Sequence, residues 1–177
     1  MKPLWCFWFL VGLIAASSSA EAQTLKEPGR VLSEKVTGVA DGDTLRLEDG
    51  REAQLIGVDC AELQLTSEDN FKVVENKLSQ PDYASQGQKA RDYAEEFIKR
   101  PNLRLVADSQ HDDAGNQDHL NRTLVYVYAG PEMLNATLLQ QGLCLREVEI
   151  RYTYLEEFRQ YEDSAKQAKK GIWEKAS

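Results

Sequence analysis

An Asp-Gly pair between two short alternating segments restricts the folds open to this chain more than any other feature. Residues 43–48 and 51–58 both alternate apolar and polar side chains in the manner of β-strands, and Asp49-Gly50 joins them. Asp-Gly is a preferred centre of a tight hairpin because glycine tolerates the positive φ that such a turn requires. The sequence therefore predicts a β-hairpin whose two outer ends meet at one edge.

Three further strands and three helices are predicted elsewhere. The strands rest on alternation of apolar residues, and the helices on apolar residues three or four apart, flanked by capping residues such as Ser85 with Gln88. Such an element order favours an α+β fold that is mainly β barrel, a five-stranded OB-fold Greek-key barrel with about three helices. The strands are expected at residues 31–39, 102–107 and 123–129, and the helices at 85–98, 131–141 and 154–170, with 143–150 either strand or bent connection.

The first 22 residues have the layout of a secretory signal peptide. Lys2 precedes an apolar run over residues 4–16, which small residues follow. A membrane anchor is the alternative, but such a run falls short of the ~20 apolar residues that a spanning helix needs. We therefore expect a signal peptide over residues 1–22, a single domain over 23–177, and a secreted or periplasmic protein without stable membrane association.

Two cysteines remain once the predicted signal peptide is removed. Cys60 and Cys144 form an even count in an exported protein, so a disulfide between them is one expectation and two lone thiols the other. Two cysteines so far apart, with His111 and His119 elsewhere, match no zinc-ligand spacing. The cysteines thus indicate covalent structure rather than a zinc site.

The net charge of −8 argues against indiscriminate binding of polyanions. Contacts to phosphates need clustered lysines and arginines, and the acidic residues here outnumber the basic ones by 29 to 21. A nucleic-acid site on this chain therefore needs a local basic patch or a bound cation.

Acidic residues gather at the open end of the predicted hairpin. Asp43 enters its first strand within Asp41-Gly42-Asp43-Thr44, and Asp59 and Glu62 follow the second. Because the open end brings Asp43 and Asp59 together, their carboxylates can hold a hard cation, with backbone carbonyls and waters completing the shell. Taken singly, each residue also fits an ordinary turn or a solvated strand end. Only the combination predicts a cation site.

Five separated segments together resemble the staphylococcal nuclease (thermonuclease) family. They occur in the family's order and cover roughly residues 31–173. Agreement at five places in that order carries the resemblance. The segments are Val39-Ala40-Asp41-Gly42-Asp43-Thr44, Leu55-Ile56-Gly57-Val58-Asp59-Cys60-Ala61-Glu62, Asn121-Arg122-Thr123-Leu124-Val125-Tyr126-Val127-Tyr128, Leu134-Asn135 with Gly142, and Gly171-Ile172-Trp173.

The resemblance implies a calcium-dependent phosphodiesterase that acts on DNA and RNA. Asp43 and Asp59 match the family's metal-binding carboxylates, and the carbonyl of Cys60 matches a backbone ligand to Ca²⁺. Glu62 matches the residue that activates the attacking water, and Arg122 matches an arginine that stabilises the transition state. These roles agree with phosphodiester hydrolysis, which needs an activated water and neutralised phosphate oxygens.

The gravest departure from the family pattern is Gln54, which stands where the family has a second phosphate-binding arginine. A neutral amide cannot offset developing negative charge, so its presence is expected to lower the rate by on the order of 10² to 10³. Arg46 and Arg51, on the same hairpin, are the candidates to compensate.

Substrate contacts are also expected to differ from those of the family. His119-Leu120-Asn121 replaces a Lys-Tyr-Gly stretch, so His119 is a candidate substrate contact. Val148 and Ile150 correspond to the family's base-stacking tyrosines, and Tyr152 and Tyr154 lie nearby as candidate replacements. Stacking on an aromatic ring contributes ~1 to 3 kcal/mol per base, so nucleotide preference is expected to be weaker or altered.

Two polar segments have no assigned role. Residues 63–82 form a long connection, with a helical turn expected around 71–78, that is either a flap bordering the site or a plain surface loop. The acidic stretch over 108–118 is either a second cation site or a solvated loop, and its spacing is not that of an EF-hand.

Two functions from different classes remain open on the sequence. The first is a secreted, monomeric, Ca²⁺-dependent nuclease of DNA or RNA, weakened by Gln54. The second is a catalytically impaired OB-fold module that binds nucleic acid or a protein partner. Metal-linked stability would discriminate between them, because a module without a metal site would show none.

Overall fold

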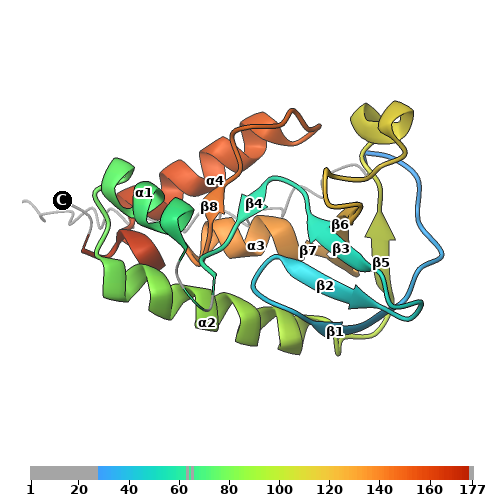
Figure 1. The fold of residues 1–177 in the computed structure, drawn as a ribbon, viewed down its shortest axis with the longest axis horizontal. Coiled ribbons are helices and arrows are strands. Elements are labelled where there is room, and N and C mark those ends of the chain that lie inside the picture. Colours follow the sequence, from blue (N-terminus) through green and yellow to red (C-terminus); the bar gives the residue numbers. More distant parts are fainter. Residues whose placement is uncertain (1–27, 63, 65, 176–177) are drawn as a thin grey trace, which may run out of the picture.

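The computed structural model describes residues 28–62, 64 and 66–175, and a curled sheet forms the right-hand side of the molecule in Figure 1. Five strands follow one another in the order β1-β2-β3-β6-β5, with β3 and β6 parallel and the other neighbours antiparallel. The strands are β1 (Val36–Val39), β2 (Thr44–Leu47), β3 (Glu52–Leu55), β6 (Thr123–Ala129) and β5 (Leu103–Val106). The short strand β7 (Glu132–Met133) adds to β6.

The chain before β1 brings the two edges of this sheet together. Val31 forms a bridge with Val106 of β5, and the backbone N–H of Leu32 donates to the carbonyl of Leu105 at 2.8 Å. The same segment then continues into β1 on the opposite edge. This pairing removes most of the open edge and confirms the predicted α+β, OB-type barrel.

Four α-helices accompany the barrel within the described residues, one more than the sequence predicts. Figure 1 shows α4 above and α2 below, with α3 between them, and one end of α2 reaches β1. The helices are α1 (Ser67–Glu75), α2 (Gln80–Phe97), α3 (Leu134–Gln140) and α4 (Leu155–Gln167), and two 3-10 turns are η1 (Ser109–Ala114) and η2 (Gly171–Trp173).

The sequence predicts that the helix corresponding to α2 begins at residue 85, and this prediction is wrong. α2 begins at Gln80, with Ser79 at its N-cap and Pro81 in its first turn, where a proline loses no hydrogen bond. The hydroxyl of Ser85 donates to the carbonyl of Asp82 inside the helix, so it caps nothing. The true start lies further upstream, and proline is its sequence signal.

The extra helix α1 takes up 9 residues of the predicted connection over residues 63–82, and it begins upstream of the helical turn expected around 71–78. Thr66 and Asp69 form a reciprocal capping box at its start, with the Thr66 hydroxyl accepting from the backbone N–H of Asp69 and the Asp69 carboxylate accepting from that of Thr66. Val73 on its inner face is buried, whereas Phe71 and Val74 are exposed. α1 is therefore an amphipathic helix docked by one face.

The bounds of two strands also differ from prediction. The first strand is limited to Val36–Val39, and the third is interrupted at Gly57, whose φ of 76° strains any residue with a Cβ. Beyond Gly57 the chain turns into β4 (Val58–Asp59), which pairs antiparallel with β8 (Leu145–Arg146). The ambiguous segment over 143–150 is thus partly a strand, and it borders the hairpin's open end.

Asn135 ties α3 to the barrel. Its side chain is fully buried, accepts from the backbone N–H of Val127, and donates to the carbonyls of Ile56 and Val125. A buried amide whose donors and acceptor all form hydrogen bonds fixes the position of the helix that carries it and also adds stability. This residue of the Leu134-Asn135 segment therefore has a structural task next to the strand that leads to Asp59.

The predicted signal peptide over residues 1–22 lies outside the described residues. In the described part of the chain, no helix is both long enough and apolar enough to cross a membrane. The boundary of the predicted domain at residue 23 also falls outside that part.

Candidate functional site

The open end of the β2–β3 hairpin packs against the turn that follows β4. A Cβ on Gly42 would lie 2.7 Å from the Cβ of Cys60, so glycine is required for this approach. The carboxylate of Asp43 accepts the backbone N–H of Cys60 at 2.7 Å. Asp41 accepts the backbone N–H of Thr44 at 2.9 Å and so shapes the turn. The predicted meeting of Asp43 with the Asp59-Cys60 segment is therefore present.

A disulfide joins this turn to the chain after α3. Cys60 and Cys144 are bonded, with their Cα atoms 4.3 Å apart, and both residues are buried. The bond closes a loop of 84 residues, which would contribute about 4 to 5 kcal/mol in the chain-entropy model. It fixes the backbone next to Asp59, and the alternative of two lone thiols is not what the structure contains.

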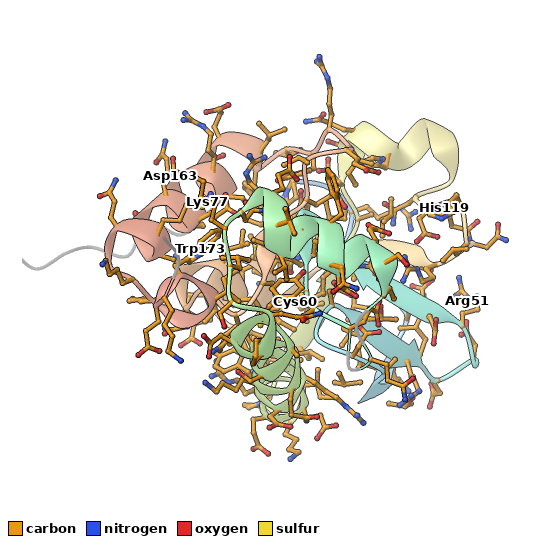
Figure 2. The ribbon with its side chains drawn as sticks, turned by 60° about the vertical axis from the view of Figure 1, so that its left-hand side comes forward. Arg51, Cys60, Lys77, His119, Asp163 and Trp173 are labelled. Atoms are coloured by element: carbon orange, nitrogen blue, oxygen red, sulfur yellow. A yellow bond between two sulfur atoms is a disulfide. The ribbon has the colours of Figure 1, made fainter. Side chains whose placement is uncertain are left out.

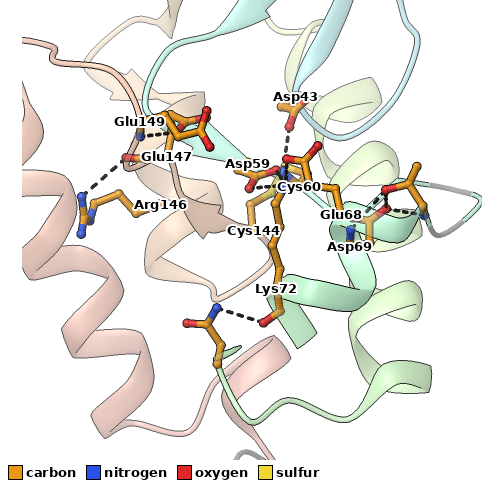
Figure 3. A network of polar contacts seen from close by, with 12 residues as sticks. Asp43, Asp59, Cys60, Glu68, Asp69, Lys72, Cys144, Arg146, Glu147 and Glu149 are labelled. Carbon is orange, nitrogen blue, oxygen red and sulfur yellow. Dashed lines mark hydrogen bonds and ion pairs between the residues drawn. A yellow bond between two sulfur atoms is a disulfide. The ribbon is translucent and has the colours of Figure 1, made fainter. Parts of the chain in front are cut away.

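Lys72 of α1 forms an ion pair with Asp59 that the sequence did not predict. Its Nζ lies 2.7 Å and 2.9 Å from the two carboxylate oxygens of Asp59, and 3.0 Å from Glu68 (Figure 3). Burial raises the pKa of Asp59 to about 6, since it outweighs the hydrogen bond and charge of Lys72, and the charges of Glu147 and Glu68 raise it further. Asp59 is thus crowded by acids and partly relieved by one lysine.

The other carboxylates of the site also have raised pKa values. Burial and the neighbouring charge of Asp41 raise the pKa of Asp43 well above its usual value, although the Cys60 N–H opposes this. Burial, followed by the charges of Asp41, Asp69 and Asp59, raises the pKa of Glu62. Carboxylates that disfavour one another's ionisation in this way form a set that a cation would stabilise.

Arg122 enters the site from the start of β6 and is held at two points. Its Nε donates to Asp118 at 2.6 Å and its Nη1 to the hydroxyl of Thr44 at 3.3 Å. Although burial opposes it, hydrogen bonding from Arg122 holds the pKa of Asp118 below its usual value. The ion pair with Asp118 that a surface arginine would form is therefore present, but it orients the guanidinium toward the site.

Gln54 joins this network through Thr44. The Thr44 hydroxyl lies 2.9 Å from the Oε1 of Gln54 and also contacts Arg122. Gln54 on β3 thus lies one hydrogen bond from the group that positions Arg122. The residue at the lost arginine position remains part of the site.

One cleft collects most of the predicted site residues. Its wall includes the α1 residues Thr66, Glu68, Asp69 and Lys72 and, from the segment after β8, Glu147 and Glu149. α1 therefore borders the site, as the flap hypothesis for residues 63–82 requires. The predicted residues that line this cleft are Asp43, Gln54, Asp59, Cys60, Glu62, His119 and Arg122.

Two predicted substrate contacts, Arg46 and Arg51, lie away from this cleft. Arg46 donates to the carbonyl of Val39 and lines a groove between β1 and α2. Arg51, at the tip of the hairpin in Figure 2, pairs with Asp49 at 2.7 Å and with Glu34 at 3.2 Å. Arg46 and Arg51 share the hairpin with Gln54 but do not reach the cleft, because Arg46 points toward β1 and Arg51 lies at the closed end of the hairpin.

The prediction that Tyr152 and Tyr154 contact substrate is also wrong for this conformation. They are 2% and 4% exposed and pack around Phe158 of α4. The Tyr152 hydroxyl donates to the carbonyl of Glu147, and the Tyr154 hydroxyl lies 3.2 Å from that of Tyr128. Their rings belong to the core, where no base can stack on them.

The donors at the cleft suit a hard cation. Oxygen ligands from carboxylates and backbone carbonyls are what Ca²⁺ prefers, and Asp43, Asp59 and Cys60 all line this cleft. Within residues 28–62, 64 and 66–175, however, no three His, Cys, Asp or Glu side chains are close enough to form a preassembled metal site. Lys72 stands at the oxygens of Asp59 instead.

Comparisons with known proteins agree with this arrangement. The family model described as staphylococcal nuclease homologue matches residues 52–175. A thermonuclease of Staphylococcus hyicus is 34% identical over 143 residues, which is 78% of this chain and 74% of that protein. A thermonuclease of Staphylococcus intermedius is 32% identical over 146 residues, 79% of this chain and 75% of that protein. With the barrel and the shared segments in place, the chain belongs to the staphylococcal nuclease family.

Proposed function

We propose that this protein is an exported, Ca²⁺-dependent nuclease that hydrolyses phosphodiester bonds of DNA or RNA. The observation that carries the proposal is the convergence of Asp43, Asp59, Glu62 and Arg122 on one cleft from three separate parts of the chain. Two relatives named thermonuclease support the class of reaction. Export rests on residues 1–22, and a monomeric state is part of the proposal.

The chain's own residues supply three of the tasks that the reaction needs. Glu62 would take a proton from the attacking water, and its raised pKa makes it a better base than an ordinary glutamate. Arg122, oriented by Asp118 and Thr44, would donate two hydrogen bonds to the phosphate. Gln54 can donate its amide N–H groups to the same phosphate but supplies no charge.

Ca²⁺ would be held by Asp43, Asp59 and the carbonyl of Cys60. When bound, it supplies a positive charge next to the nonbridging oxygens and lowers the pKa of water. Carboxylates outnumber the cationic side chains of Lys72 and Arg122 in the cleft, since Glu68, Glu147 and Glu149 line it as well. A protein with a net charge of −8 does not attract a polyanion by itself. A bound divalent ion would supply the local positive charge that attracts the nucleic acid.

The direct test is release of acid-soluble nucleotides from single-stranded DNA and from RNA by the mature protein, with Ca²⁺ and with chelator. We expect Ca²⁺-dependent release that Glu62→Gln lowers by about 10² or more. Glu48→Gln, at an exposed ion pair with Lys35 on the barrel, is the matched control and should leave release unchanged. Absence of release from both substrates, with Ca²⁺ present, would favour the binding module without catalysis.

A further inference from the structure

Lys72 stands where a cation bound by Asp59 would stand. Its Nζ lies within 2.7 Å and 2.9 Å of the two oxygens of that carboxylate, so a single positive charge bridges both. Calcium ligands in proteins lie at roughly 2.3 to 2.6 Å. The ammonium and a metal ion cannot occupy this position at the same time.

The lysine is held in this position by a docked helix. The capping box of Thr66 and Asp69 fixes the start of α1, and buried Val73 packs in a cluster with Tyr83 and Leu145. The adjacent position 72 is thereby turned toward Asp59, and the Lys72 side chain is 19% exposed. This lysine has a defined place in the site (Figure 3), unlike a mobile surface lysine.

Lys72 also has a second partner, Glu68, which is not one of the proposed metal ligands. Glu68 lies one helical turn earlier, 3.0 Å from the Nζ, and its side chain is 74% exposed. Because Lys72 touches both carboxylates, it can leave Asp59 and keep an ion pair. The helix α1 thus carries both Lys72 and Glu68, a second carboxylate with which Lys72 can pair.

From this geometry we propose that Lys72 is a tethered cation that competes with the metal for Asp59 and is displaced onto Glu68 when the metal binds. The inference rests on the proposed metal-dependent function and names a residue that sets its metal requirement. Without metal, Lys72 offsets part of the negative charge that gathers around the carboxylate of Asp59. With metal, the divalent ion takes over that task.

The first consequence is a lowered metal affinity in the natural protein. A site open for only a fraction of the time binds its ligand with an affinity reduced by that fraction. If Lys72 rests on Asp59 about 90% of the time, Lys72→Met should tighten Ca²⁺ binding by about tenfold. Lys72→Arg, which keeps the charge, should bind no tighter than the natural protein.

Isothermal titration of the mature protein with Ca²⁺ tests this without reference to catalysis. Lys35→Met is the matched control, since Lys35 pairs with Glu48 at 3.5 Å far from the cleft, and it should leave the affinity unchanged. Equal or weaker binding by Lys72→Met would overturn the competition while leaving the metal-dependent function standing. Failure of every variant, Lys72→Met included, to bind Ca²⁺ would overturn both.

Glu68 provides a second, oppositely directed test. Removal of the alternative partner by Glu68→Gln should hold Lys72 on Asp59 and weaken Ca²⁺ binding. In the Lys72→Met background the same substitution should have little further effect, because no lysine remains to be exchanged. An equal loss in both backgrounds would mean that Glu68 acts through its own charge, and the exchange would be refuted.

Discussion

Two aspartates, the fully buried Asp108 and the half-buried Asp59, show how the surroundings decide what the same side chain does. Asp108 is fully buried and accepts hydrogen bonds from the Tyr126 hydroxyl, the Gln110 N–H, and both the N–H and hydroxyl of Thr153, all at 2.7 to 2.9 Å. Burial alone would raise its pKa, but these bonds outweigh it and lower the pKa. Asp59 has instead a raised pKa and one lysine.

The difference separates a structural carboxylate from a functional one. Donors surround Asp108 and tie the end of β5 to β6 and to residue 153, so its charge is satisfied by the fold itself. Acidic residues surround Asp59, so its negative charge is offset only by a cation, which is either Lys72 of α1 or a bound metal ion. The acidic stretch that begins at Asp108 is thus not simply a solvated loop, because its first residue supports the barrel.

The largest effect should come from neutralising the functional aspartate. Asp59→Asn removes a charged metal ligand, so Ca²⁺-dependent cleavage should fall by about 10² to 10³. The melting temperature measured in chelator should not fall, because the substitution also removes a charge that burial disfavours. A large drop in that melting temperature would contradict the distinction drawn between the two aspartates.

Neutralising the structural aspartate should have the reverse outcome. Asp108→Asn leaves several buried donors facing an amide, so the free energy of unfolding should fall by about 3 kcal/mol. Chemical denaturation in chelator measures this change. Ca²⁺ affinity, measured at a temperature where the variant is folded, should stay within about twofold, because Asp108 does not line the cleft. A strong loss of affinity would show that the two regions are coupled.

The contrast also explains which parts of the molecule could be predicted. The hairpin and its Asp43–Asp59 meeting follow from local rules, because an Asp-Gly turn fixes which ends of two strands adjoin. Lys72 escaped prediction because its partner lies 13 residues away and meets it only after α1 docks. The capping box at Thr66 and Asp69 was the available signal for α1, and polar composition hid it.

The direction of side chains was harder to predict from the sequence than the hairpin was. By strand register Arg46 lies on the same face of the hairpin as Gln54, but its guanidinium turns to the carbonyl of Val39 on β1 and does not line the cleft. Tyr152 and Tyr154 looked like surface aromatics in a polar segment, yet the packing of α4 against β6 buries them. Side-chain contacts and tertiary packing decide these cases, and neither is encoded by motif spacing alone.

A smaller effect should follow from restoring a charge at residue 54. Gln54→Arg places a second guanidinium beside Arg122 in a cleft rich in carboxylates, so kcat/KM for single-stranded DNA should rise by about tenfold. Gln54→Glu, the opposite change in charge, should lower it. No gain from arginine would indicate that the Gln54–Thr44 hydrogen bond matters more for Arg122 than the added charge does.

The mildest test uses protons as competitors of the metal. Because the pKa of Asp59 is raised to about 6, the carboxyl becomes protonated as the pH falls through that value, and Ca²⁺ affinity should decline there. Raising Ca²⁺ displaces the proton, so the midpoint of the acid limb of cleavage should move to lower pH, by up to about one unit per tenfold in Ca²⁺. Asp108, whose pKa is lowered, should contribute nothing to this limb. An acid limb that Ca²⁺ does not move would show that the group limiting activity binds no metal.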